Sequence, residues 1–92
     1  MAVHVISYDL RHPGRDYEAL YEAIMSYGSY ARVNESVWCI KTQETCVQVR
    51  DHLQKHIDNN DLLFVARLSG EAAWVGLGDK VSKWLKDALE GR

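Results

Sequence analysis

The sequence predicts a small α+β domain in which strands alternate with amphipathic helices. Two observations predict this class. Apolar residues recur every three or four positions in three segments, and β-branched and aromatic residues fill most of the segments between them. The 92 residues are 47% hydrophobic and 26% charged, with a single proline. This balance is typical of a globular protein and excludes disordered and collagen-like chains, so we expect one domain.

Residues 2–10 are predicted to form the first strand, with apolar side chains on both of its faces. His12-Pro13-Gly14 indicates a turn. Asp16 is expected to cap the first helix, and Gly28 is expected to end it in the left-handed conformation. The apolar stripe of this helix consists of Tyr17, Leu20, Tyr21, Ile24 and Met25.

Residues 30–42 are rich in aromatic and β-branched residues, with the polar Asn34-Glu35-Ser36 in the middle. This pattern predicts two strands joined by a tight turn, or one bulged ribbon. Thr42 is expected to cap a second helix, which ends near the polar cluster Asp58-Asn59-Asn60. The apolar stripe of this helix consists of Cys46, Val49, Leu53 and Ile57.

Residues 61–69 are predicted to form the last strand, which is apolar on both faces and is broken by Gly70. Residues 72–78 are apolar and glycine-punctuated, which indicates either a short strand or a packed loop. Asp79 is expected to cap a last helix. Its apolar stripe consists of Val81, Trp84, Leu85, Ala88 and Leu89.

The predicted order matches the split βαβ, or ferredoxin-like, plan: a βαββαβ antiparallel sheet with two helices on one face. Residues 1–70 would form this domain, and residues 71–92 would add an apolar segment and an amphipathic helix that packs on the core or on a dimer. Because the strands are apolar on both faces, something must cover the second face. The helical tail or a second copy of the chain would do so, and a symmetric homodimer is the commonest solution.

Composition also limits the surroundings of the chain. A net charge of −2 excludes a strongly basic nucleic-acid coat protein, although local basic patches remain compatible with it. No apolar run approaches the roughly 18 residues of a membrane span, and the first residues show no secretory signal. Cys39 and Cys46 are expected to be buried thiols of a reducing compartment, and their spacing predicts no Cys–His arrangement. We therefore expect a cytoplasmic protein with no membrane partner.

Asp9 is the strongest candidate for chemistry, because a carboxylate at the end of the first strand can lie at the rim of the sheet. One carboxylate is a poor metal site, but in a two-fold dimer two copies would converge on the axis. Mg²⁺ is often held by one or two carboxylates, waters and a substrate phosphate, and it would assist phosphodiester cleavage there. The alternative is that Asp9 caps a turn or pairs with Arg11.

Basic and imidazole side chains provide weaker candidates. Arg11 and Arg15 flank the first turn and Arg32 opens the middle strand pair, so these three are predicted to contact nucleic-acid phosphates or, alternatively, to form a solvated surface. His52 and His56 are four residues apart, a spacing that lets two imidazoles share a metal. No further ligand at a recognisable spacing completes such a site, which favours a solvated helix flank.

Several short motifs occur together in a characteristic order over about residues 1–69. They are Val5-Ile6-Ser7-Tyr8-Asp9-Leu10, Tyr27-Gly28, Arg32-Val33-Asn34-Glu35-Ser36-Val37-Trp38, Ile57-Asp58 and Asp61. In this order and spacing the chain resembles the CRISPR-associated Cas-two superfamily, which includes VapD-type toxins and small bacterial and phage proteins labelled SinR-like.

The resemblance implies a ferredoxin-like fold and a homodimer formed through the sheets. Some members of the superfamily are metal-dependent nucleases of single-stranded RNA or double-stranded DNA, and the VapD branch resembles ribonuclease toxins. Others are scaffolds that hold the spacer-integrating enzyme and its DNA. The first-strand aspartate of the family matches Asp9, the arginine before its "V-Q-x-S-V" motif matches Arg32, and the serine of that motif matches Ser36.

The chain departs from the family's pattern at two places, and the second favours a stand-alone relative over a spacer-integration scaffold. Asn34 replaces the usual glutamine, and residues 72–92 replace the short strand that commonly crosses to the partner. Two functions follow as hypotheses. One is a dimeric Mg²⁺-dependent endonuclease of a defence or toxin system, with RNA favoured over DNA as its substrate. The other is a non-catalytic dimeric module, CRISPR-related or phage-encoded, that binds protein or nucleic acid.

Overall fold

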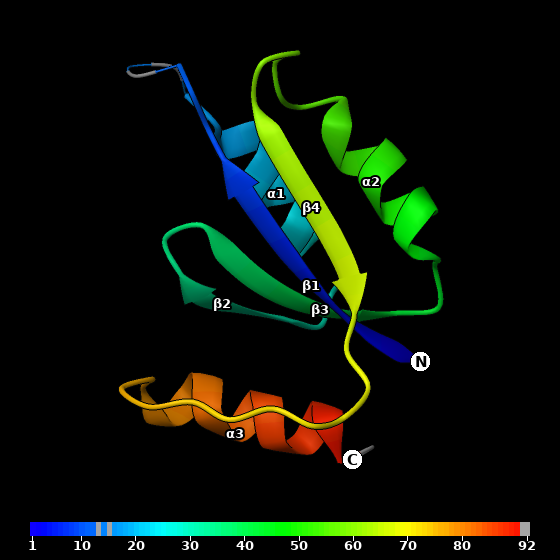
Figure 1. Ribbon diagram of the computed structural model, residues 1–92, viewed down its shortest axis with the longest axis vertical. Helices are drawn as coiled ribbons and strands as arrows, with labels where there is room; N and C mark the ends of the chain where they lie inside the picture. The colour runs from blue at the N-terminus through cyan, green and yellow to red at the C-terminus, as the bar shows by residue number, and fades with distance from the viewer. Residues whose placement is uncertain (13, 15, 91–92) are drawn as a thin grey trace.

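The computed structural model describes residues 1–12, 14 and 16–90 of the chain. These residues form a mixed α+β domain with a four-stranded antiparallel sheet and three helices, which confirms the predicted class (Figure 1). The strand order is β2-β3-β1-β4. The elements are β1 (Ala2–Asp9), α1 (Glu18–Met25), β2 (Tyr30–Asn34), β3 (Val37–Thr42), α2 (Cys46–Gln54), β4 (Leu62–Arg67) and α3 (Asp79–Leu89).

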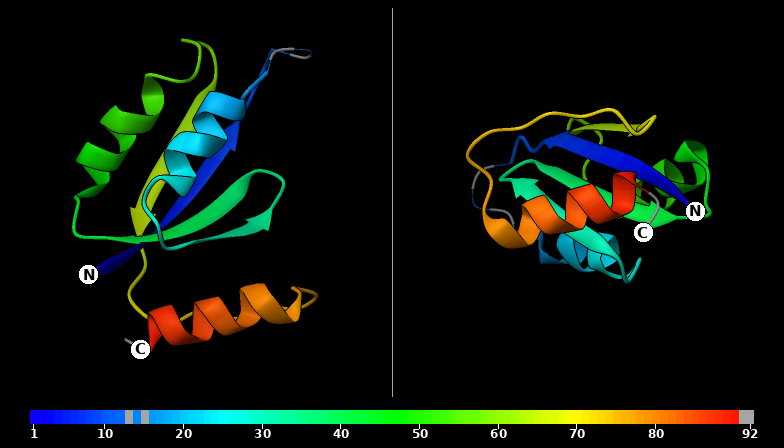
Figure 2. Two further views of the ribbon diagram at one scale, coloured as in Figure 1. Left: turned by 180° about the vertical axis from the view of Figure 1, so that it is seen from behind. Right: turned by 90° about the horizontal axis from the view of Figure 1, so that it is seen from below.

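Helices α1 and α2 pack on one face of the sheet and form the main core with it (Figure 2). Ile6 and Ile40 point from neighbouring strands toward Leu20 and Ile24 of α1 and Leu53 of α2, and all five side chains are fully buried. Each such burial contributes about 1.5–3 kcal/mol, so this layer provides most of the hydrophobic stabilisation.

Helix α3 packs against the opposite face, where Leu85 and Ala88 are buried against Val3 of β1 and Cys39 of β3. In Figure 1 this helix lies beside one end of the sheet, apart from α1 and α2. The helical tail therefore covers only part of the second face. Leu62 and Phe64 of β4 remain 50% and 64% exposed, so an apolar area stays open in the single chain.

The first turn of α2 corrects one predicted boundary, because its cap is Thr45 and not Thr42. The Thr45 hydroxyl accepts the Gln48 backbone N–H at 3.2 Å, and the Gln48 side-chain oxygen accepts the Thr45 N–H at 2.8 Å. This reciprocal pair is a capping box. The Thr42 hydroxyl instead accepts the Glu44 N–H at 3.2 Å, in the loop that leads into the helix.

Other boundaries follow local chemistry. Tyr17 and Ser26 occupy the two cap positions of α1, so the predicted caps Asp16 and Gly28 are each displaced from the helix ends. The Asp16 carboxylate still accepts the Glu18 N–H at 2.9 Å, and Gly28 has the predicted left-handed conformation, with a φ of 84°. Gly78 occupies the cap position of α3, so the prediction that Asp79 caps this helix is wrong. Asp79 is its first helical residue, where a carboxylate interacts favourably with the positive end of the helix dipole. Residues 72–78 form no strand.

Asp61 joins three segments at the end of the sheet that carries the β1–α1 loop. Asp61 is buried, with 8% of its surface exposed. Its carboxylate accepts hydrogen bonds from the Arg11 N–H at 2.7 Å, the Asp58 N–H at 2.8 Å and the Tyr17 hydroxyl at 3.0 and 3.1 Å. Burial acts to raise the pKa of Asp61, but the hydrogen bonds from Arg11, Asp58 and Tyr17 outweigh it, and the pKa is lowered overall.

The lowered pKa of Asp61 predicts a specific loss of stability in acid. The folded state binds fewer protons than the unfolded chain near pH 4, so the stabilisation is complete above the unfolded carboxyl pKa of about 3.9 and is lost as the pH falls below it. Melting temperatures from pH 7 to pH 3 should show that Asp61→Asn is less stable than wild type at neutral pH, with a difference that shrinks in acid. Asp51→Asn, at an exposed carboxylate, is the control. A difference that stays constant with pH would contradict the prediction.

Candidate functional site

Asp9, Arg32 and Ser36 line one open cavity with a volume of about 760 Å³ at the rim of the sheet. Asp9 ends β1, Arg32 lies on β2, and Ser36 lies in the turn between β2 and β3. This turn is held beside the end of β1 because the Tyr8 N–H donates to the Ser36 carbonyl at 3.1 Å. The remaining lining residues are Tyr8, Leu10, Tyr21 and Glu35.

The guanidinium of Arg32 is held over two aromatic rings. It lies 4.8 Å from the centroid of Tyr21 and 5.1 Å from that of Trp38, and it donates to the Glu35 carbonyl at 2.9 Å. Cation–π contacts of this kind contribute about 0.5–1 kcal/mol at exposed sites and limit the positions that the side chain can adopt. Arg32 is therefore an oriented positive charge at the cavity wall, suited to bind an anion.

Tyr8 also lines this cavity and contacts the residues around Arg32. Its hydroxyl donates to the Glu35 carbonyl at 2.9 Å and accepts the Trp38 indole N–H at 3.0 Å. Burial raises the pKa of Tyr8, so the phenol stays protonated and remains a donor at neutral pH. The sequence did not identify Tyr8 as a site residue, because the signal at this position was only that of an apolar strand residue.

Asp9 is exposed and pairs with Arg11, whose Nη2 lies 3.2 Å from Asp9 Oδ2. The pairing that the sequence offered as an alternative role for Asp9 is therefore present. An exposed ion pair is worth at most about 1 kcal/mol, so a divalent cation or a phosphate can displace either partner. Arg11 lies beside the cavity and does not line it, and Arg15 lies outside the described residues.

Asp9 and Glu35 provide the carboxylates of the cavity. Among residues 1–12, 14 and 16–90, no group of three or more His, Cys, Asp and Glu side chains is placed to hold a metal ion. The rings of His52 and His56 lie edge to face at 5.9 Å on α2. The described residues of one chain thus offer no closed metal site, but two carboxylates fit the way Mg²⁺ binds with waters and a substrate phosphate.

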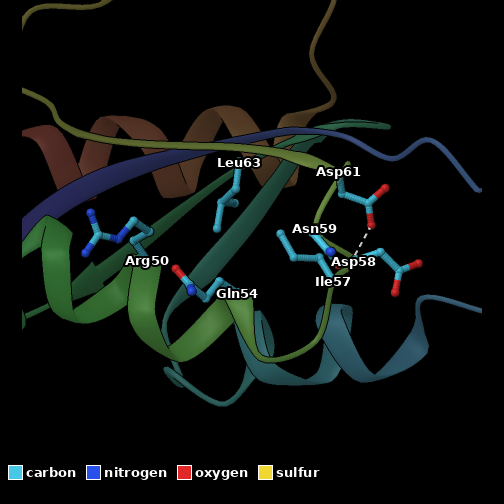
Figure 3. Close-up of a pocket in the computed structure, with 7 residues that line it drawn as sticks. All are labelled: Arg50, Gln54, Ile57, Asp58, Asn59, Asp61 and Leu63. Carbon is cyan, nitrogen blue, oxygen red and sulfur yellow. Dashed lines mark hydrogen bonds between the residues drawn. The ribbon is translucent and has the colours of Figure 1, made fainter.

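A second cavity, of about 490 Å³, lies between α2 and the β4 end of the sheet, as Figure 3 shows. Arg50 and Gln54 reach it from α2, and Asp58 and Asp61 line it from the loop before β4. The Arg50 guanidinium pairs with Asp51 at 2.8 Å, and the Asp61 carboxylate is already used by three donors of the fold. Asp61 thus holds the loop and Arg50 is paired within α2, which makes the Asp9 cavity the stronger candidate.

One of the two cysteines departs from the prediction that both are buried. Cys39 is buried, at 3% exposure, whereas Cys46 is only partly buried. No helix in the described part of the chain has the length and apolarity needed to cross a membrane. None of the protein-family models compared with this chain matches it.

Proposed function

We propose that the chain is a Cas-two-like homodimer of ferredoxin-like fold that binds RNA and cleaves it with the help of Mg²⁺. The observation that carries this proposal is that Asp9, Arg32 and Ser36, drawn from three elements, line one cavity at the rim of the sheet. These are the three residues that the resemblance matches individually to residues of the superfamily. Their convergence supports a shared role in binding a phosphate.

The topology supports the fold assignment. The elements follow one another as strand, helix, strand, strand, helix, strand, and the sheet order from its opposite edge is β4-β1-β3-β2. This succession, with both α1 and α2 packed on one face, is the arrangement expected of a ferredoxin-like domain.

The open apolar area supports the dimer. Phe64 and Leu62 lie on β4 opposite Ser7 and Asp9 of β1, so the exposed side chains lie next to the candidate carboxylate. A two-fold contact through this area would bury Phe64 and bring the two copies of Asp9 close to each other. The dimer thus accounts for both the uncovered face and the missing ligands of a single chain.

Each side chain then has a distinct part. Arg32, oriented by Tyr21 and Trp38, would bind a phosphate oxygen, and Ser36 would donate a hydrogen bond to it. Asp9 from both copies, with Glu35, would hold Mg²⁺, and Arg11 would turn from Asp9 to the nucleic-acid backbone. When bound, this ion supplies an activated water and offsets the charge that develops on the phosphate.

The second candidate is a non-catalytic dimer that binds nucleic acid or protein. The Asp9–Arg11 ion pair favours it, because a carboxylate already paired with a cation can serve the β1–α1 loop alone. In this case Arg32 still binds anions, and the cavity is a binding surface without cleavage.

Asp9→Asn separates the two candidates. Wild type should cut single-stranded RNA with Mg²⁺ or Mn²⁺ and not with chelator, and Asp9→Asn should abolish this metal-dependent cleavage without changing the dimer. The matched control is Asp51→Asn, which should leave cleavage unchanged. Wild type that cuts neither RNA nor DNA with either ion would exclude the enzyme.

The affinity for RNA tests whether the Asp9 cavity binds nucleic acid, with or without cleavage. Arg32→Ala should weaken RNA binding and lower the slope of log affinity against log salt by about one, because one phosphate contact is lost. Arg50→Ala, in the second cavity, is the control and should leave both unchanged. If Arg32→Ala has this effect in a protein that does not cleave, the chain is the binding module. If Arg32→Ala leaves binding unchanged, the cavity is not the nucleic-acid site.

A further inference from the structure

His4 and Cys46, which are 42 residues apart in the sequence, meet where β1 passes the first residue of α2. His4 is 2% exposed. Its Nε2 lies 2.8 Å from the Glu44 carbonyl oxygen, and its Nδ1 lies 3.6 Å from Cys46 Sγ. The imidazole is therefore held between a backbone carbonyl and a thiol.

The carbonyl determines which ring nitrogen carries the proton. A carbonyl oxygen can only accept, so Nε2 of His4 must donate to Glu44, and Nδ1 of the neutral ring is left as the acceptor. The Cys46 S–H then donates to Nδ1. A nucleophile hydrogen-bonded to a base that a third group orients is the arrangement of an activated nucleophile.

The two cysteines of the chain differ in the features that control reactivity. Cys46 is partly exposed and contacts His4, whereas Cys39, on β3, is buried in the cluster that packs against α3. Burial raises the pKa of Cys39 to about 11, which keeps it a protonated, unreactive thiol at neutral pH. Cys39 thus serves as an unreactive control, in the same chain, for the reactivity of Cys46.

We propose that Cys46 is a modification site whose thiol, with His4 as its base, reacts with small hydroperoxides. His4 Nδ1 takes the thiol proton as the sulfur attacks one peroxide oxygen. The S–O bond forms as the O–O bond breaks, and the leaving hydroxide takes the proton from His4 to give water. With hydrogen peroxide the products are one sulfenic acid and one water: the sulfur is oxidised by two electrons and the peroxide is reduced.

The surroundings of His4 and Cys46 are separate from the Asp9 cavity. His4 is near the start of β1 and Asp9 is at its end, and Cys46 is the first residue of α2. Two charged residues lie near them: Arg67, which is opposite His4 on β4, and Glu44, whose carboxylate accepts the Tyr27 hydroxyl at 2.9 Å. The inference therefore does not depend on the proposed nuclease.

The test treats the full chain with hydrogen peroxide, traps sulfenic acid with dimedone and measures each cysteine by mass spectrometry. Cys46 should be modified and Cys39 should not. His4→Gln keeps a donor for the Glu44 carbonyl but provides no base, and it should slow the reaction about tenfold at pH 7. The ratio of wild-type to variant rates should fall toward one above about pH 9, where a free thiol ionises without help. A merely structural role for His4 would leave this ratio independent of pH.

Val47→Cys in a Cys46→Ser background is the matched control. Val47 is 55% exposed and is the next residue of the same helix turn, so this thiol has greater access but a different neighbour. Cys46 should react faster than the cysteine at position 47 even though it is less exposed. The comparison uses a folded chain even if His4→Gln does not fold. Equal or slower reaction at Cys46 would overturn the proposal, as would a His4→Gln variant that folds and reacts at the wild-type rate.

Discussion

Leu85→Ala is expected to destabilise the fold by about 2–5 kcal/mol, the cost of removing a large side chain from a core and leaving a cavity. Leu85 is 5% exposed and packs with Val3, Cys39 and Ala88 between α3 and the sheet. If α3 is part of the cooperative fold, urea unfolding followed by circular dichroism should show one transition with a lower midpoint.

Two variants in the same tail provide the comparison. Val75 is 95% exposed in the loop before α3, so Val75→Ala should change the free energy of unfolding by less than about 0.5 kcal/mol. Trp84 is half-buried and its indole N–H donates to the Ser29 hydroxyl at 3.2 Å, so Trp84→Ala should fall between the other two. Equal effects for Leu85→Ala and Val75→Ala would mean that α3 is detached in solution.

Much of the fold was predictable because the apolar pattern of each element matches its environment. The stripe that contains Leu85 and Ala88 indicated a buried helix face, and the polar interruption before Val37 separated β2 from β3. How much of the sheet face opposite α1 and α2 would be covered by α3 was not predictable. Pattern alone shows that Phe64 is apolar, but whether α3 reaches it depends on the path of the loop at residues 68–78.

Helix ends show where a usable signal was missed. Thr42 and Thr45 are equally good capping residues by type, but only Thr45 is followed three positions later by Gln48. That spacing completes a capping box and identifies the true start of α2.

The candidate site was predictable in part. Asp9 and Arg32 were named from their charge and their places in the strands, and Ser36 was named from the resemblance. A strand end and a tight turn are places where side chains can converge. Tyr8 was missed because a strand residue with one polar atom looks apolar until its hydroxyl partner is known. His4 and Cys46 were missed because their contact depends on the register of β1 against the start of α2, which no local spacing encodes.

Phe64→Glu is expected to convert the proposed dimer into a monomer. The side chain is 64% exposed in one chain and lies opposite Ser7 in the middle of the open apolar area. Burying an unpaired carboxylate there would cost about 3 kcal/mol or more, which raises the dimer dissociation constant by more than about 100-fold. Sedimentation at micromolar concentration should give a dimer for wild type and a mass near 10.5 kDa for the variant.

The same variant links assembly to the chemistry at Asp9. Because Phe64 lies outside the Asp9 cavity, a monomeric Phe64→Glu chain should keep the fold and the Arg32 side of the cavity. It should lose the proposed Mg²⁺-dependent cleavage, because the proposal places one Asp9 from each copy at the ion. Val75→Glu places the same charge at a fully exposed apolar residue of the tail, and it should remain dimeric and active. A wild-type chain that sediments only as a monomer would exclude the dimer and, with it, the shared ion. A monomeric Phe64→Glu that still cleaves would instead place the complete catalytic machinery, with Asp9 and Glu35 as its carboxylates, in one chain.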